Sequence, residues 1–216
     1  MKHLFVLSLF ISCFFITHAQ EHTEQPIRPD AVFMGNSITQ NWRNFHPDFF
    51  TRNNFVGKGI GGEVTLQMLA RFRRDVISLN PKVLVILAGT NDIAQNQGYV
   101  THRQIMDNIA SMVDLAHFNN IRVILCSVLP AYSYRWRPDE FNQTVRPAEA
   151  IQRLNGMIRK YALEHDCAYV DFWTPMSDDK GGMKDGLSSD GVHPHPDAYF
   201  FMEELITPVI QQLCMQ

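Results

Sequence analysis

The sequence predicts an α/β fold, a three-layer α/β/α sandwich in which helices cover both faces of a parallel five-stranded sheet. Short apolar runs alternate along the chain with segments in which apolar residues recur every three or four positions, as expected of successive strand and helix units. Several runs also lack the polar alternation of a strand with one solvated face. A length of 216 residues, of which 45% are hydrophobic, fits one globular domain. The net charge of −3 gives no sign of nucleic-acid binding.

Five apolar runs are the predicted strands. They span residues 31–35, 54–57, 82–88, 122–128 and 168–172. The last three runs have no polar residue at alternate positions of their centres, which is typical of strands that are buried on both faces.

Apolar residues at helical spacing predict the main helices between and after these strands. The predicted buried stripes are Leu66, Leu69, Phe72 and Val76; Ile105, Ile109, Met112 and Ala116; Ile151, Leu154, Ile158 and Ala162; and, in a last helix over residues 196–213, Phe201, Leu205, Val209 and Leu213. No repeat or linker divides these units, so we predict a single domain over residues 20–216.

The amino terminus has the pattern of a secretory signal. A lysine and a histidine precede an apolar run at residues 4–16, and small residues follow at the two positions that a signal peptidase reads. We therefore predict a signal peptide over residues 1–19 and a secreted or periplasmic protein without a membrane span. An uncleaved anchor and lipidation at Cys13 are the alternatives.

Removal of this segment leaves three cysteines, Cys126, Cys167 and Cys214, without the short spacings of a metal site. Cys126 falls within a predicted buried strand, where a cysteine is a small core residue. We predict no structural disulfide.

Ligands of open parallel sheets bind beyond the carboxyl ends of the strands, so the residues that follow each run are the candidates for function. Ser37 follows the first run and opens a predicted helix, where its hydroxyl would lie near unpaired backbone N–H groups. This is a suitable place for a nucleophile. Taken alone, the segment 35–39 is better explained as an ordinary turn with helix-capping residues, so the case for a nucleophile depends on residues further along the chain.

Asp190 and His193 lie three residues apart in a loop that a glycine and a proline keep out of helical structure. A tight turn would bring the carboxylate to one imidazole nitrogen and leave the other to take a proton from Ser37, which is the logic of a serine hydrolase. An Asp-Gly turn with an unrelated histidine is the alternative. A metal site with His195 is weaker, because no further ligand stands at a recognisable spacing, and we predict no metal.

Asn91 and Gly62 follow the third and second runs and are the candidate oxyanion donors. A side-chain amide and an unobstructed backbone N–H both stabilise a developing oxyanion, and the N–H of Ser37 would add a third donor. Gly61 is an alternative to Gly62. The same residues also suit a helix cap and a flexible turn.

Residues 57–62 match Gly-x-Gly-x-x-Gly, the fingerprint of dinucleotide binding. The match follows the second predicted strand rather than the first, and the acidic residue expected about 20 positions later is missing. Secretion also argues against a nicotinamide enzyme, so we predict no cofactor.

Four spaced blocks resemble the conserved blocks of the SGNH hydrolases, also called the GDSL-like lipase/acylhydrolase family. They are residues 35–37, Gly62, residues 89–92 and residues 190–194, in that order, and they span nearly all of the mature chain. The resemblance implies a flavodoxin-like sandwich, a triad of Ser37, His193 and Asp190, and an oxyanion hole from Ser37, Gly62 and Asn91. The family's usual Gly-Asp-Ser is Gly-Asn-Ser here, and we expect Asn36 to change local hydrogen bonding and not the reaction.

The resemblance implies ester hydrolysis but does not identify the ester, because relatives deacylate sugars, lysophospholipids, thioesters and simple esters. The loop after the fourth run carries Tyr134, Arg135 and Trp136, and aromatic faces of this kind stack on sugars. The same loop could also pack on its own aromatic rings.

We therefore predict a serine esterase that removes short acyl groups, such as acetyl, from a carbohydrate, with a small-molecule or glycan ester as its partner. A lysophospholipase or a broad arylesterase is the nearest alternative. A non-catalytic carbohydrate-binding protein on the same scaffold is another. The sequence does not indicate the oligomeric state.

Overall fold

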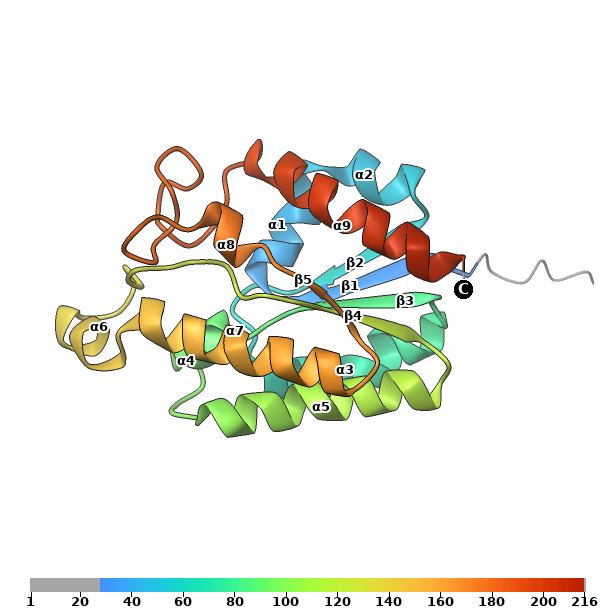
Figure 1. Ribbon diagram of the computed structural model, residues 1–216, viewed down its shortest axis with the longest axis horizontal. Coiled ribbons are helices and arrows are strands. Elements are labelled where there is room, and N and C mark those ends of the chain that lie inside the picture. Colours follow the sequence, from blue (N-terminus) through green and yellow to red (C-terminus); the bar gives the residue numbers. More distant parts are fainter. Residues whose placement is uncertain (1–27, 216) are drawn as a thin grey trace, which may run out of the picture.

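The computed structural model describes residues 28–215, in which five parallel strands lie between two layers of helices (Figure 1). The strands are β1 (Ala31–Gly35), β2 (Phe55–Gly59), β3 (Val83–Leu87), β4 (Arg122–Cys126) and β5 (Ala168–Val170). Their order, β2-β1-β3-β4-β5, is that of the flavodoxin-like sheet. The predicted sandwich is confirmed, while the predicted signal peptide lies outside the described residues.

The helices divide between the two faces of the sheet. They are α1 (Ser37–Phe45), α2 (Pro47–Arg52), α3 (Thr65–Asp75), α4 (Thr90–Ile93), α5 (His102–Phe118), α6 (Asp139–Val145), α7 (Pro147–Glu164), α8 (Trp173–Met176) and α9 (Ala198–Cys214), with a 3-10 turn η1 (Ile77–Leu79). Helices α3, α5 and α7 pack on one face, and α1, α2 and α9 pack on the other (Figure 1). The short helices α2, α4, α6 and α8 were not predicted, because one or two turns are too short to show a hydrophobic period.

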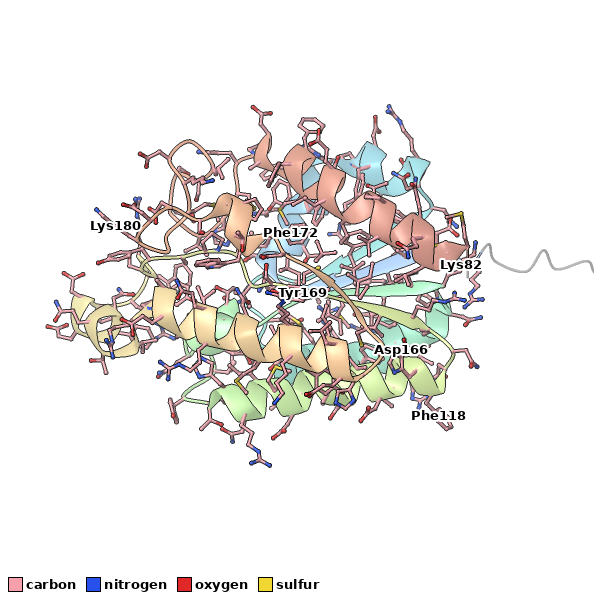
Figure 2. All side chains as sticks on the ribbon, in the orientation of Figure 1. Lys82, Phe118, Asp166, Tyr169, Phe172 and Lys180 are labelled. Atoms are coloured by element: carbon pink, nitrogen blue, oxygen red, sulfur yellow. The ribbon has the colours of Figure 1, made fainter. Side chains whose placement is uncertain are left out.

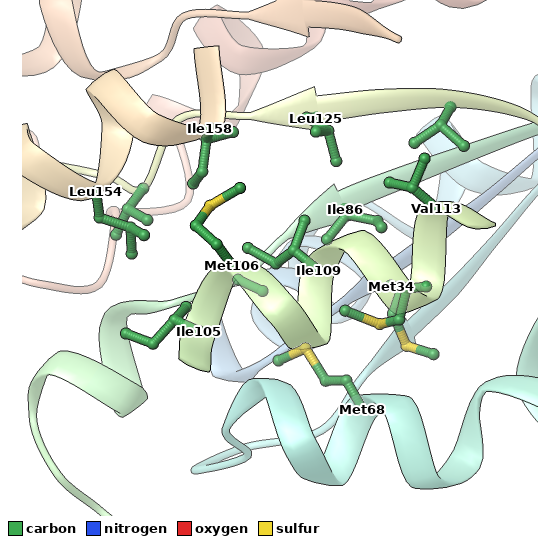
Figure 3. Close-up of a cluster of buried hydrophobic side chains, with 14 of the residues drawn as sticks. Met34, Met68, Ile86, Ile105, Met106, Ile109, Val113, Leu125, Leu154 and Ile158 are labelled. Atoms are coloured by element: carbon green, nitrogen blue, oxygen red, sulfur yellow. The ribbon is translucent and has the colours of Figure 1, made fainter. Parts of the chain in front are cut away.

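The core between the sheet and α5 is built from alternate strand residues (Figure 3). Met34, Ile86 and Leu125 of three adjacent strands meet Ile109 and Val113 of α5 there. The stripes predicted for α5 and α7 are confirmed, since all eight of their residues are buried.

The stripes predicted for α3 and α9 were partly wrong. Leu66 is 61% exposed, and Met68 fills the core position next to Phe72. In α9 the buried side chains are Ala198, Tyr199, Met202, Ile206 and Ile210, so the predicted set of Phe201, Leu205, Val209 and Leu213 is only partly buried. Because α9 is apolar on most of its surface, its hydrophobic period does not identify the face that meets the sheet.

The loops that leave the carboxyl ends of the strands lie at one end of the molecule. Lys180, in the loop after α8, lies at this end, and Lys82, just before β3, lies at the opposite end (Figure 2). Ser37 after β1 and Asn91 after β3 therefore emerge on the side of Lys180.

Over residues 28–215, no helix combines the length and apolar character needed to cross a membrane. Cys126, Cys167 and Cys214 are free thiols, and Cys126 is buried in β4.

Candidate active site

Ser37, His193 and Asp190 form a continuous hydrogen-bonded chain. The Oγ of Ser37 lies 2.8 Å from Nε2 of His193, and Nδ1 of the same ring lies 2.6 Å from Oδ2 of Asp190. Ser37 is the first residue of α1, directly beyond β1, whereas the other two lie in the loop before α9. An imidazole held between a carboxylate and a hydroxyl can accept the hydroxyl proton, which makes the oxygen a nucleophile.

Asp190 is fixed by its second carboxylate oxygen as well. Oδ1 accepts hydrogen bonds from the backbone N–H groups of Val192 and His193, at 2.9 and 2.8 Å, and from Oγ of Ser188 at 3.0 Å. Burial raises the pKa of Asp190, but the hydrogen bonds from His193 and Val192 outweigh burial and hold this pKa well below its ordinary value. The carboxylate therefore stays ionised beside the imidazole.

Asn36 caps the helix that carries Ser37. Its Oδ1 accepts the backbone N–H of Ile38 at 3.0 Å, and the side chain is buried. An aspartate would cap the same N–H group, so asparagine retains this function while its NH₂ group replaces an acceptor with a donor.

The loop after β2 presents the candidate backbone donor of an oxyanion hole. Gly62 has a φ of +77°, a conformation that side chains disfavour. The N–H of Gly61 donates to Oε1 of Gln40 at 2.7 Å and is engaged. The structure therefore favours Gly62 over Gly61 as the donor.

Asn91 is held against the same loop. Its Nδ2 donates to the carbonyl oxygen of Glu63, next to Gly62, at 2.9 Å. An amide nitrogen carries two hydrogens, so the second can serve an incoming oxyanion. Asn91 is only 4% exposed, and this burial restricts the motion of its side chain.

Trp136 is the residue of the predicted substrate loop that lies beside the histidine. Its ring centroid is 6.4 Å from that of His193, and 45% of the residue is exposed. The indole packs on Tyr134 at 5.0 Å and donates from Nε1 to Oδ1 of Asn96 at 3.3 Å. Arg135 is exposed in the same loop.

The prediction that Tyr134 contacts a substrate is wrong. Its ring is fully buried, and its hydroxyl is hydrogen-bonded to Oγ1 of Thr90 at 3.1 Å. Tyr134 instead packs against the indole of Trp136, with its ring tilted by 40°.

The sequence placed Asp92, the residue after Asn91, in the block of residues 89–92 but did not predict its contacts. Its carboxylate accepts from the backbone N–H of Thr65 at 3.1 Å and from Oγ1 of the same residue at 2.6 Å, which joins α4 to the start of α3. Burial raises the pKa of Asp92 to about 6. Its position beside a candidate oxyanion donor was the available signal.

Within residues 28–215, no group of three or more His, Cys, Asp or Glu side chains is arranged to hold a metal ion.

The sequence model of the GDSL-like Lipase/Acylhydrolase family matches residues 33–199, most of the chain. The chain belongs to this family. The resemblance seen in the sequence is therefore confirmed, and by its family the protein is a hydrolase of the type that acts on esters.

Known proteins resemble this chain in fold or in sequence. A GDSL-like lipase from Bacteroides thetaiotaomicron is 42% identical, with a TM-score of 0.80 over 84% of this chain and 87% of the other. An acetyl xylan esterase superposes with a TM-score of 0.64 at 20% identity, over 83% of this chain and 98% of the other. An uncharacterized lipoprotein from Bacillus subtilis is 25% identical over 84% of both chains.

Proposed function

We propose that this GDSL-family hydrolase is a serine esterase that removes short acyl groups, acetyl in particular, from a carbohydrate. The observation that carries the proposal is the chain of contacts from Ser37 Oγ to His193 Nε2, at 2.8 Å, and from His193 Nδ1 to Asp190 Oδ2, at 2.6 Å. Family membership supports the ester as the bond that is broken.

The first half of the reaction acylates Ser37. Oγ attacks the carbonyl carbon of the ester while Nε2 of His193 takes its proton. The carbonyl oxygen becomes an oxyanion, which accepts hydrogen bonds from the N–H groups of Ser37 and Gly62 and from Nδ2 of Asn91. When the tetrahedral intermediate collapses, the alcohol leaves with the proton held by His193, and the acyl group remains on Oγ.

The second half releases the acid. His193 takes a proton from a water molecule, which attacks the acyl carbonyl and regenerates the oxyanion in the same place. Collapse breaks the bond to Oγ, and the proton returns from His193 to Ser37. Asp190 stays ionised throughout, orients the imidazole through Nδ1 and stabilises its protonated form.

The substrate class is supported by the position of Trp136. Because His193 delivers its proton to the departing alcohol, a ring 6.4 Å from that imidazole borders the space of the alcohol rather than that of the acyl group. A partly exposed indole face suits stacking on a sugar ring. Among the solved structures with this fold, one is an acetyl xylan esterase, which is consistent with the same class.

The test is a release assay with acetylated oligosaccharides and lysophospholipids, performed with the wild-type protein and Ser37→Ala. We expect acetate release from the sugar esters and a loss of about 10⁴-fold or more in kcat in the variant. Ser78→Ala is the control, because it removes a hydroxyl bonded to the Arg73 carbonyl in the segment after α3. Equal activity of Ser37→Ala would overturn the nucleophile, faster fatty-acid release would favour a lysophospholipase, and binding without release would favour a carbohydrate-binding protein.

A further inference from the structure

A buried arginine connects the ends of β1 and β2 with the loop that carries Gly62. Arg71 of α3 has a side chain that is only 7% exposed. Its Nη2 donates to the carbonyl oxygens of Gly35, at 3.1 Å, and Lys58, at 2.9 Å. These two carbonyls belong to the ends of β1 and β2, and Gly35 lies two residues before Ser37.

The same guanidinium holds the loop that contains Gly62. Nε of Arg71 donates to Oε2 of Glu63 at 2.6 Å, and the side chain of Glu63 is 15% exposed. The backbone carbonyl of Glu63 accepts Nδ2 of Asn91 at 2.9 Å. Glu63 is thus anchored by its side chain, bonded through its backbone to one oxyanion donor, and adjacent in sequence to another.

Arg71 is also paired with a second carboxylate. Nη1 donates to Oδ2 of Asp75 at 2.8 Å, and this carboxylate also accepts from Arg74. Burial raises the pKa of Asp75, but the hydrogen bonds from Arg74 and Arg71 outweigh it and bring the pKa below its ordinary value. Four hydrogen bonds from one planar group with fixed donor directions define its position relative to both strands.

We propose that Arg71 and Glu63 are positioning residues for the oxyanion hole, which set Gly62 and Asn91 at a fixed place relative to Ser37. This inference rests on the proposed esterase function and goes beyond the triad. A buried ion pair is weak evidence for stability by itself, because desolvation offsets its attraction. Its geometric effect is larger, since donors must meet the oxyanion within a few tenths of an ångström and small misplacements lower the rate steeply.

The test compares Glu63→Ala with Glu63→Gln. Alanine removes the acceptor for Nε of Arg71, so we expect kcat on a p-nitrophenyl acetate substrate to fall by about 10–10²-fold while KM changes less than about twofold. The inhibition constant of a trifluoromethyl ketone, which forms a tetrahedral adduct on the serine, should rise by the same factor. Glutamine keeps a neutral acceptor and should restore most of kcat.

Glu203→Ala is the matched control. Glu203 of α9 is equally buried, with 14% side-chain exposure, and makes an equally short contact of 2.6 Å with Nδ1 of His46 on the other face of the sheet. Its Oε1 also accepts from Nε1 of Trp42 at 2.9 Å, near the end of α1 opposite Ser37. We expect this variant to lose a comparable amount of thermal stability with an unchanged kcat. Arg71→Lys, which keeps the charge and loses the fork of donors, should show the kcat loss of Glu63→Ala even if the latter folds poorly.

The outcomes separate this inference from the proposed function. If Ser37→Ala abolishes activity while Glu63→Ala and Arg71→Lys lose only stability, as Glu203→Ala does, the positioning role is overturned and the esterase stands. If Ser37→Ala retains full activity, the esterase mechanism is overturned and the positioning role with it.

Discussion

At the scale of single residues, Asn91 contributes a donor to the candidate site and also a bond to the loop beside it. We expect Asn91→Ala to lower kcat by about 10²–10³, equivalent to ~2.7–4 kcal/mol of transition-state stabilisation, with a smaller change in KM. Steady-state kinetics on a simple acetyl ester measures both values. A KM increase at constant kcat would instead assign Asn91 to ground-state binding.

A second asparagine provides the control for this experiment. Asn119 at the end of α5 donates from Nδ2 to the carbonyl oxygen of Leu115 at 2.7 Å. Asn119→Ala therefore removes an amide with one backbone partner, as Asn91→Ala does, but from a helix end away from Ser37. Its kcat should equal that of the wild type.

The sequence predicts the positions of residues that are close together in the chain or that directly follow a strand. Asp190 and His193, for example, are three positions apart, and a tight turn brings their side chains into contact. Arg71 and Glu63 gave no such signal, because charged residues on an amphipathic helix and its preceding loop ordinarily face solvent. The prediction that Tyr134 contacts a substrate failed because the sequence of an irregular loop does not indicate which of its aromatic rings is buried.

At the scale of elements, α4 is joined to two longer helices through a buried carboxylate. Asp92 of α4 accepts from Thr65 at the start of α3, and Nδ2 of Asn108 in α5 donates to Oγ1 of the same threonine at 3.0 Å. The short helix that carries Asn91 is therefore fixed by polar contacts. Hydrophobic periodicity, which predicted α5 and α7, contains no information about such contacts.

This carboxylate predicts a pH dependence of stability. Burial raises the pKa of Asp92 from 3.8 to about 6, so the folded state binds more protons than the unfolded state between these values. The contribution of Asp92 to the free energy of unfolding should fall as pH rises from about 4 to 6, by about 3 kcal/mol, and stay low above that range. Asp92→Asn should remove this part of the slope.

Urea unfolding of the wild type and Asp92→Asn, at intervals across this pH range, measures the difference between their slopes. The comparison isolates Asp92 because other carboxylates titrate in both proteins. The loss of a good acceptor for Thr65 shifts the whole curve of the variant without changing its slope. Parallel curves for the two proteins would contradict the assignment.

At the scale of the whole molecule, the alternation of strand and helix units predicts most of the fold. Because the carboxyl ends of parallel strands all lie on one side of the sheet, the four distant segments that follow them are expected to lie together there. The order of the elements does not predict which side chains of each loop are buried, because this depends on packing between the layers. The loop after β4 shows this, since it buries Tyr134 and leaves Trp136 at the surface.

The amino-terminal end of the described chain lies at the other end of the molecule. Nε of Arg28 donates to the carbonyl oxygen of Asn80 at 2.7 Å, and Asp30 pairs with Lys82 at 2.7 Å. Lys82 marks the end opposite the loop of Lys180 (Figure 2). Removal of residues 1–19, as the sequence predicts, deletes none of these contacts.

We therefore expect the exported protein to begin at Gln20 and to be active without its first 19 residues. Intact-mass measurement on protein from the periplasm or the medium checks the cleavage site, and Cys13→Ser should change neither mass nor fraction. A membrane-bound form that begins at a lipid-modified Cys13 would contradict this prediction; the Bacillus subtilis relative is named as a lipoprotein. A mass that includes Met1 would indicate an uncleaved anchor. The described chain enters the fold just before β1, at the amino ends of the strands, whereas Ser37 lies directly beyond the carboxyl end of β1.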